Sequence, residues 1–311
     1  MHLNPPLIEI LLSTYNGEQY LPQLFDSILS QTYDNWRLLI RDDSSQDSTI
    51  EIINAYRRKY PDKFVMLEFL KKNVGHNRSF AVLLEAAGEE YTAFCDQDDV
   101  WLPQKLEIQM NQLLKQQNLV GKQTPVLVHS DLKVCDHKMN FISDSMWRYQ
   151  KILPKKMKNI KCMLVQNCVT GCTILMNRAL INITIPIPEQ AIMYDWWTAL
   201  LALEHGKIIS IKEPLVMYRQ HEKNAIGAKK WGFSYLVRTA LGKKSKWMVT
   251  LHGTILQAAA LERLLNNKDQ EVIRRYSLLS KAGFIKRKII YLHIGIKKYG
   301  LLRQIAAWFF I

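Results

Sequence analysis

Three aspartates stand within four positions in the segment FCDQDDV, directly after the apolar run YTAFC (91–95). Carboxylates this close repel one another, and a divalent cation with oxygen ligands keeps Asp96, Asp98 and Asp99 ionised together. Mg²⁺ or Mn²⁺ suits them best, because each binds one or two protein carboxylates and fills its other positions with phosphate oxygens and water. A solvated acidic turn is the alternative. Phosphatases and nucleases carry similar clusters, so the cluster alone does not name a reaction.

A second pair of aspartates, Asp42 and Asp43, follows the apolar run WRLLI (36–40). Their side-chain oxygens can form a turn and cap the helix that follows. They can equally accept hydrogen bonds from a nucleotide base. The residues by themselves leave both roles open.

These polar clusters need elements that hold them together, and the chain alternates apolar runs with helical faces. Strands are predicted at 7–12, 36–40, 64–70 and 91–95, helices at 21–29, 50–56 and 80–87, and further strands at 125–136 and 168–176. This alternation predicts an α/β fold with a mostly parallel sheet and helices on both faces. Ligands bind such sheets outside the carboxyl ends of the strands, so we expect the polar clusters at one edge.

The formal net charge of +14 is unevenly spread over the 311 residues. Residues 229–311 hold 17 basic and three acidic residues and therefore carry the whole excess. We place a boundary near residue 228, between a first domain over 1–228 and a basic helical extension over 229–311.

The extension has an amphipathic pattern, with four apolar residues on one predicted helical face: Ile285, Ile289, Leu292 and Ile296. Basic residues surround them, which is typical of a helix lying on an anionic membrane surface. A helical pair that joins two copies into a homodimer is the alternative. No apolar run reaches the 18 residues of a spanning helix, and five cysteines without a CxxC pair argue against a disulfide framework.

Five segments in order resemble glycosyltransferase family 2, whose members have the GT-A fold: STYNGEQYL, QTYDNWRLLIRDDSSQDST, FCDQDDVWLPQKL, MYDWWTALLA and MYRQHEKNAIGA. The last two resemble the branch that contains rhamnosyltransferases of bacterial cell-wall and capsular polysaccharides. The resemblance covers about residues 7–228. It implies a Rossmann-like GT-A sheet over 1–228 that binds a nucleotide sugar and catalyses its transfer.

The resemblance also implies the residues of a donor site. Ser13 and Tyr15 would lie against the nucleotide base, and Asp43 would bond its edge. Arg78 would face the phosphates, and Asp96 would hold the ribose.

A metal site and a catalytic base follow from the same resemblance. Asp98, Asp99 and His221 would hold Mn²⁺ or Mg²⁺, and Arg219 would return to the diphosphate. Asp195 would be the base, although many relatives carry Glu-Asp where this chain has a tyrosine before the aspartate. The two tryptophans after it, 196 and 197, suit sugar stacking or core packing equally.

These roles predict an inverting, metal-dependent glycosyltransferase. The nucleotide sugar leaves as a nucleoside diphosphate, so the metal and Arg78 would neutralise its growing charge. One carboxylate suffices as the base of a single inverting displacement. The resemblance implies rhamnose from dTDP-rhamnose as the donor sugar. A UDP-glucose or UDP-galactose donor is the alternative.

The expected acceptor is a saccharide, lipid-linked, in cell-surface polysaccharide synthesis. The expected location is cytoplasmic, peripheral to the inner face of the bacterial cell membrane. A basic nucleic-acid-binding protein would explain the extension, but it would leave Asp43, Asp98 and Asp195 without a purpose. We therefore expect no nucleic-acid partner.

Overall fold

The computed structural model describes residues 5–67, 72–222, 244–265, 269–300, 303, 304 and 308. The end of the predicted strand 64–70, the boundary near residue 228 and the last residues of MYRQHEKNAIGA lie outside these ranges. In the described part, no helix combines the length and the apolar character that crossing a membrane requires. All five cysteines are free thiols.

The first third of the chain alternates strands and helices as predicted: β1 (Ile8–Thr14), α1 (Leu21–Leu29), β2 (Trp36–Asp42), α2 (Thr49–Lys59), β3 (Phe64–Met66), α3 (His76–Ala86) and β4 (Tyr91–Asp96). The β1 strand pairs in parallel with both β2 and β4, and β2 pairs in parallel with β3. These strands are the parallel half of the sheet.

The middle of the chain adds shorter elements and a second set of strands: β5 (Val100–Trp101), α4 (Lys105–Val120), β6 (Val126–Cys135), β7 (Phe141–Ser143), α5 (Met146–Tyr149), α6 (Pro154–Met157), α7 (Ile160–Met163), η1 (Gly171–Thr173), β8 (Ile174–Asn177), α8 (Arg178–Thr184), α9 (Tyr194–His205) and β9 (Lys207–Arg219). The described strands form one sheet in the order β3-β2-β1-β4-β8-β6-β9-β5, with β7 beside β6. Antiparallel β8 joins the parallel half to a mixed half, where β9 runs parallel to β6.

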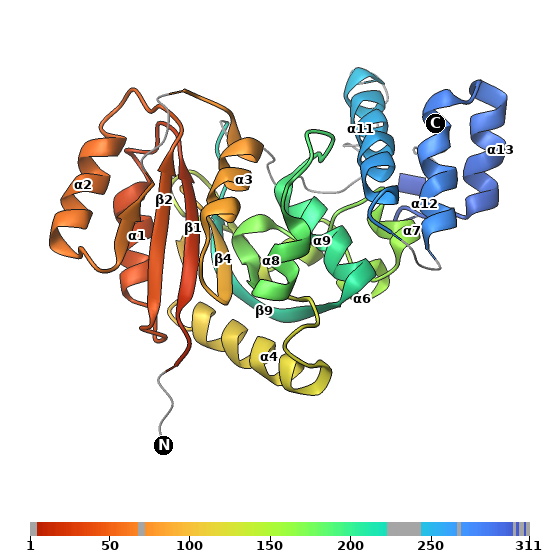
Figure 1. The fold of residues 1–311 in the computed structure, drawn as a ribbon. Helices are drawn as coiled ribbons and strands as arrows, with labels where there is room; N and C mark the ends of the chain where they lie inside the picture. Colours follow the sequence, from red (N-terminus) through yellow and green to blue (C-terminus); the bar gives the residue numbers. More distant parts are fainter. Residues whose placement is uncertain are drawn as a thin grey trace.

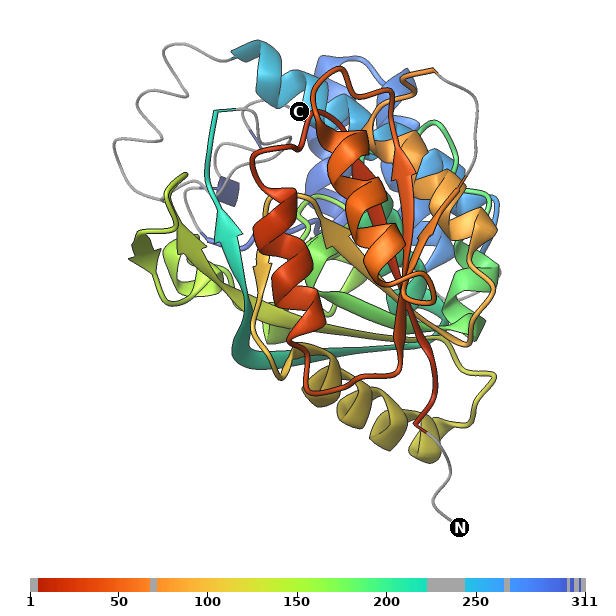
Figure 2. The same cartoon turned by 90° about the vertical axis from the view of Figure 1, so that its left-hand side faces the viewer.

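Each face of the sheet has its own apolar core, because successive side chains of a strand point to opposite sides. Ile10 and Leu12 of β1 pack with α1, α2 and α4 in one cluster. Leu11, between them, packs with α3, α8 and α9 in the other. Figures 1 and 2 show α1 and α2 on one side of the strands and α3 on the other.

The basic extension forms α11 (Lys244–Glu262), α12 (Gln270–Ser277), η2 (Leu278–Lys281) and α13 (Phe284–Ile294). Figure 1 shows α11, α12 and α13 beyond α9. Their buried residues, among them Ala258, Ile273 and Tyr276, belong to the same apolar cluster as α3 and α9. The guanidinium of Arg303 also donates to the backbone carbonyls of Gln150 and Lys151. The described part of the extension is therefore continuous with the core beneath the sheet.

We predict that this shared core makes the extension unfold together with the sheet. Ile273→Ala removes a fully buried side chain and should lower the free energy of unfolding by about 2–5 kcal/mol. Leu278→Ala, at the next turn and 44% exposed, is the matched control and should change it by about 0.5 kcal/mol or less. Urea unfolding followed by circular dichroism measures both. If the loss of stability in Ile273→Ala is confined to an early, separate unfolding transition, the extension folds independently of the sheet.

Candidate active site

The carboxyl ends of β1, β2 and β4 meet at one edge of the sheet, as the strand pattern predicted. Ser13 lies opposite Asp96 in the register of β1 and β4, and Thr14 lies opposite Asp42 in that of β1 and β2. The Thr14 hydroxyl donates to the Asp42 carboxylate over 2.8 Å. Parallel strands in register thus bring together side chains that are far apart in the sequence.

Tyr15 is joined to the acidic turn by Gln97. Its backbone N–H donates to Gln97 Oε1 over 2.8 Å, and its carbonyl accepts from Gln97 Nε2 over 3.0 Å. A Cβ at Gly17 would lie 2.6 Å from the same Oε1. Any larger residue at position 17 would therefore force the Gln97 side-chain amide to shift. The Tyr15 ring is 47% exposed and is free to meet a ligand. Sequence reasoning missed this role of Gln97.

Asp43 is buried and holds the turn that precedes α3. Its carboxylate accepts from the backbone N–H groups of Val74 and Gly75 at 2.9 and 2.8 Å, and from Arg41 at 2.7 Å. These hydrogen bonds support the turn-forming role of Asp43. Its bonding to the edge of a nucleotide base stays a prediction. Arg41 also donates to the hydroxyl of Ser79, which accepts from Ser13 at 2.6 Å.

The Asp98 side chain is paired with His221. Their Oδ2 and Nε2 atoms are 2.7 Å apart, and both side chains are mostly buried. The His221 ring stacks on Tyr20 with 5.0 Å between centroids and 14° between planes. The residues that follow β9 thus return to the acidic turn, while the diphosphate and metal contacts that the resemblance implies for them stay predictions.

Arg219 is buried and holds the end of β9 against the acidic turn. Its guanidinium donates to the carbonyls of Asp98 and His137 and to Gln23 Oε1, at 2.8, 3.0 and 2.6 Å. It also lies over the Tyr20 ring, 5.0 Å from the centroid. These partners give Arg219 a positioning role. Its predicted contact with a diphosphate remains untested.

Asp99 lies at the bottom of the acidic turn with no solvent exposure. One oxygen accepts from the backbone N–H of Arg219 at 3.2 Å, and Oδ2 accepts no hydrogen bond within the described structure. Ligand atoms of Asp96, Asp99 and Cys172 lie within 4.8 Å of one another. Burial, reinforced by the other two aspartates, raises the pKa of Asp99 well above its usual range.

A buried lysine stands close to these carboxylates. Lys105 has no solvent exposure, and its ammonium lies 3.7 Å from the centroid of the Trp101 ring. It donates to Gln109, whose amide donates to the carbonyl of Thr173 in η1. Burial lowers the pKa of Lys105 to about 8, while Asp99 is among the anions that oppose this change. The lysine therefore supplies part of the compensating charge beneath the site.

Asp195 lies in the first turn of α9 and is 8% exposed. Its Oδ2 accepts from the backbone N–H of Gly171 at 3.0 Å. Burial raises the pKa of Asp195 to about 7, and the Asp96 carboxylate adds to the rise against the backbone hydrogen bonds. A carboxyl with this pKa can accept a proton at neutral pH.

An aromatic wall joins Asp195 to the acidic cluster. Tyr194 stacks on Phe80 at 4.1 Å, and its hydroxyl lies 3.5 Å from Asp96 Oδ1. A Cβ at Gly171 would approach that hydroxyl to 2.2 Å, so the Tyr194 ring fills the space that any larger residue needs. Tyr194 thus connects the start of α9, which carries Asp195, with the acidic turn.

The segment before Asp195 is held from two sides. Asn77 of α3 donates to the carbonyl of Ala191 at 3.0 Å, and fully buried Gln257 of α11 accepts from the N–H of Ile192 at 2.9 Å. Sequence reasoning missed both residues. A single glutamine in the apolar stretch TILQAAAL was the available signal.

Arg78 is not brought to the cluster by a described contact. Its side chain is 55% exposed and pairs with Glu85 of the same helix at 3.4 Å. His76, which the sequence analysis passed over, is closer to the acidic turn, with Nε2 3.7 Å from Asp96 Oδ1. Burial disfavours its charge, but the carboxylate of Asp96 outweighs that effect and raises the pKa of His76.

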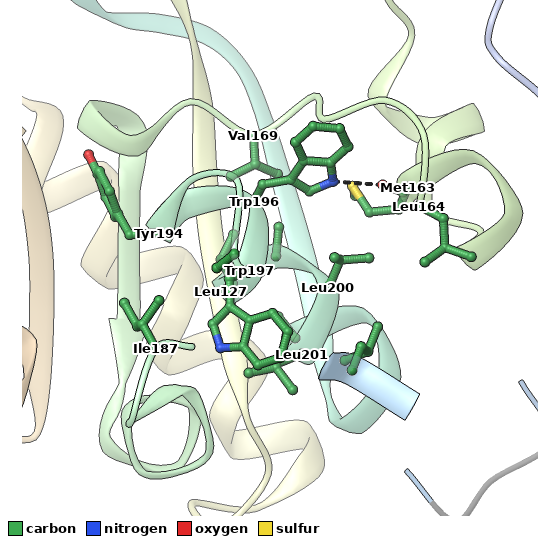
Figure 3. Packing of buried hydrophobic residues seen from close by; sticks show 14 of the residues in the cluster. Leu127, Met163, Leu164, Val169, Ile187, Tyr194, Trp196, Trp197, Leu200 and Leu201 are labelled. Carbon is green, nitrogen blue, oxygen red and sulfur yellow. Dashed lines mark hydrogen bonds between the residues drawn. The ribbon is translucent and has the colours of Figure 1, made fainter. Parts of the chain in front are cut away.

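Trp196 and Trp197 are core residues. Figure 3 shows both indoles packed among aliphatic side chains. Trp196 Nε1 donates to the Met163 carbonyl at 2.7 Å, and Trp197 Nε1 donates to Thr184 at 3.1 Å. Exposures of 7% and 1% leave no ring face for a sugar. The core-packing alternative is therefore correct for both.

Parallel strands that end in an acidic turn, joined by an antiparallel strand to a mixed half, are the architecture of GT-A glycosyltransferases. Residues 9–184 match the profile of glycosyl transferase family 2, and the chain belongs to this family.

Curated relatives agree with this assignment. An uncharacterized glycosyltransferase of Haemophilus influenzae is 40% identical over 140 residues, which are 45% of this chain and about half (52%) of that protein. The Escherichia coli protein WfgD, a UDP-Glc:α-D-GlcNAc-diphosphoundecaprenol β-1,3-glucosyltransferase, is 29% identical over 62% of this chain and 70% of its own length.

Solved structures show the same fold at low sequence identity. The crystal structure of S. aureus TarS with UDP-GlcNAc has a TM-score of 0.57 and 15% identity, over 92% of this chain and 79% of that one. The mannosyltransferase PcManGT of Pyrobaculum calidifontis, with GDP-Man and Mn²⁺, has a TM-score of 0.56 and 13% identity, over 98% and 84%. The predicted GT-A fold is confirmed.

We predict that Asp195 titrates near pH 7 in the metal-free protein, because it is buried beside a second carboxylate. Carbon-13 NMR of protein labelled at the aspartate carboxyls should show one such signal, absent in Asp195→Asn. Asp96→Asn should move it to lower pH, since one of the charges that oppose ionisation is gone. The exposed control Asp62→Asn should leave it in place. The assignment is wrong if every carboxyl other than Asp99 titrates below about pH 5.

Proposed function

We propose that this protein is an inverting, metal-dependent glycosyltransferase that moves a sugar from a nucleotide donor to a saccharide acceptor. The observation that supports this best is the position of Asp195. Its buried carboxyl, with a pKa of about 7, stands one aromatic side chain away from the acidic turn of a nucleotide-binding sheet edge. Family membership supplies the reaction class.

The donor site in this proposal lies along the ends of β1, β2 and β4. The exposed Tyr15 ring offers a face for the base, and Ser13 and Asp96 line the same edge. The sequence resemblance favours rhamnose from dTDP-rhamnose. A UDP-glucose donor is the second candidate, because the E. coli relative is named for that donor.

The metal proposal rests on the acidic turn and the histidine that meets it. Asp98 and His221 are adjacent, and carboxylate oxygens are the ligands that Mg²⁺ and Mn²⁺ favour. Asp99 was predicted as a metal ligand. Because it is completely buried and accepts from the Arg219 N–H, we assign it instead to supporting Asp98 and Arg219 from below. Bound Mn²⁺ or Mg²⁺ would offset negative charge on the leaving diphosphate. PcManGT, the structural neighbour, was solved with Mn²⁺.

Asp195 would act on the acceptor in a single displacement. The acceptor hydroxyl attacks the anomeric carbon from the face opposite the nucleotide, and its proton passes to Asp195. The bond to the diphosphate oxygen breaks as the new bond forms, so the configuration inverts. His76 and Arg78, both in the first turn of α3, are the proposed cations for the phosphates.

The proposed acceptor is a lipid-linked saccharide at the cytoplasmic face of the bacterial membrane. The E. coli relative is named for a sugar on diphosphoundecaprenol, which supports an acceptor of that class. A nucleic-acid-binding role for the basic extension would leave the buried Asp195 and the acidic turn without a purpose.

A panel of nucleotide sugars tests the proposal directly. Purified protein is incubated with Mn²⁺, a saccharide acceptor mixture and each donor in turn, and release of UDP or dTDP is measured. Release from dTDP-rhamnose alone supports the rhamnose assignment, and release from UDP-glucose alone supports the second candidate. Absence of release from every donor would count against the proposed function.

Asp195→Asn should preserve folding and donor binding but lower transfer by about 10²–10⁴, since an amide cannot accept the proton. In the parent, the transfer rate should rise with pH through about 7, as the carboxyl loses its proton. Asp62→Asn, exposed and remote, is the control. Retention of more than about a tenth of the parent rate would identify another base.

Asp98→Ala should remove the metal dependence of donor binding. Isothermal calorimetry with UDP and with dTDP, with and without Mn²⁺, compares the variant with the parent. If the variant binds nucleotide with the parent's metal dependence, the metal assignment is wrong.

A further inference from the structure

The α13 helix leaves an apolar stripe uncovered. Phe284, Ile285, Ile289 and Leu292 are 67%, 74%, 56% and 62% exposed. The opposite side of the helix is buried in the core through residues such as Tyr291. A surface helix of a globular protein normally has one apolar face, so the second face of α13 needs a partner. We call these four residues the α13 face. Figure 1 shows the helix at the outer margin of the molecule.

Cations surround the α13 face, and the sequence contains no Asp or Glu after residue 271. Lys281, Lys286 and Lys297 are exposed. The Lys288 ammonium lies 4.8 Å from the ring centroid of Phe284 and 4.2 Å from that of Trp308, so an aromatic pair with a cation between them borders the stripe. Exposed apolar side chains with a basic surround match the chemistry of an anionic lipid surface.

An apolar hollow continues the face toward α12. Leu278, Ile289, Ile290 and Ile294 line it, and the side chains of Arg275 and His293 stand at the same place. A branched or acyl chain can enter such a hollow. The Arg275 guanidinium is paired with the Glu271 carboxylate, with 2.6 Å between Nε and Oε1, so the hollow adds apolar surface and the cations come from the lysines around α13.

A second copy of this chain is a poorer occupant than a bilayer. In a twofold contact the same surface meets itself, so the lysines of the surround would face a surround of the same positive charge. No acidic side chain follows residue 271 to pair with them. Like charges brought together at a contact disfavour association, whereas anionic lipids neutralise the same charges.

We propose that the α13 face is the membrane-docking surface of this enzyme and that it binds an anionic bilayer. The inference rests on the proposed function only for the membrane location. It does not require a particular donor, metal or base.

Sedimentation of the full-length protein with vesicles tests the assignment. The parent should pellet with vesicles of phosphatidylglycerol and phosphatidylcholine, and less with phosphatidylcholine alone or at high salt. The double variant Ile285→Glu, Ile289→Glu should lower the partition coefficient at least about tenfold, because two apolar side chains no longer insert. Lys286→Glu should lower it about fivefold or more on the anionic vesicles, from about 1 kcal/mol for the lost cation.

Leu119→Glu is the matched control, since Leu119 is 75% exposed on α4 and its change has the same chemistry. It should sediment as the parent does. All substituted side chains are exposed, and an unchanged thermal midpoint verifies the fold of each variant. Equal pelleting of the double variant and the parent overturns the proposal. So does a parent that is dimeric on a sizing column while the double variant is monomeric, because the face would then serve assembly.

Nucleotide release without vesicles separates this proposal from the proposed function. The double variant should match the parent in that assay, since the α13 face holds none of the proposed site residues. If the parent binds vesicles but releases nucleotide from no donor, the docking proposal holds and the transferase proposal fails. If the parent is active but does not bind vesicles, the transferase proposal holds and the docking proposal fails.

Discussion

Crowding of negative charge at one edge of the sheet is the constraint that governs this molecule. Asp96, Asp98, Asp99 and Asp195 lie close together with little solvent exposure, and burial reinforced by neighbouring carboxylates raises the pKa values of Asp99 and Asp195. The surrounding structure offsets that cost with cations and donors from separate elements. A histidine that follows β9 and backbone N–H groups each hold one carboxylate, and the Lys105 ammonium adds positive charge beneath the turn. Much of the chain's middle third serves to bring these partners in.

The two halves of the sheet contribute different parts of the site. The parallel half ends in the acidic turn and the exposed Tyr15 ring. The mixed half supplies Arg219 at the end of β9 and Gly171 just ahead of β8. Because antiparallel β8 bonds to both β4 and β6, these parts sit on one continuous sheet. The match to the family profile ends at residue 184, so the segment with Asp195 lies outside the matched residues.

Local periodicity predicted the front of the fold well, since strands and helices there alternate with clear turns, and α1 occupies its predicted residues. It missed β9, because Lys212, Glu213 and Pro214 interrupt the apolar pattern where the register with β6 shifts. Residue types also located the carboxylates of the site. They could not reveal partners: that Arg219 would hold backbone carbonyls, that Asp43 would hold a turn, or that Gln257 would reach from the extension. Such pairings depend on how elements distant in the sequence pack together, which no local sequence pattern encodes.

The short η1 turn limits how this enzyme can be redesigned. The Gly171 N–H holds Asp195, the Cys172 thiol lies beside Asp99, and the Thr173 carbonyl accepts from the α4 amide network. A substitution chosen to improve one of these contacts changes the other two. Variation aimed at a new sugar or nucleotide therefore has little room in this turn. The Tyr15 side chain is 47% exposed, so replacement there is less constrained, and libraries for altered donor use are better placed at that position.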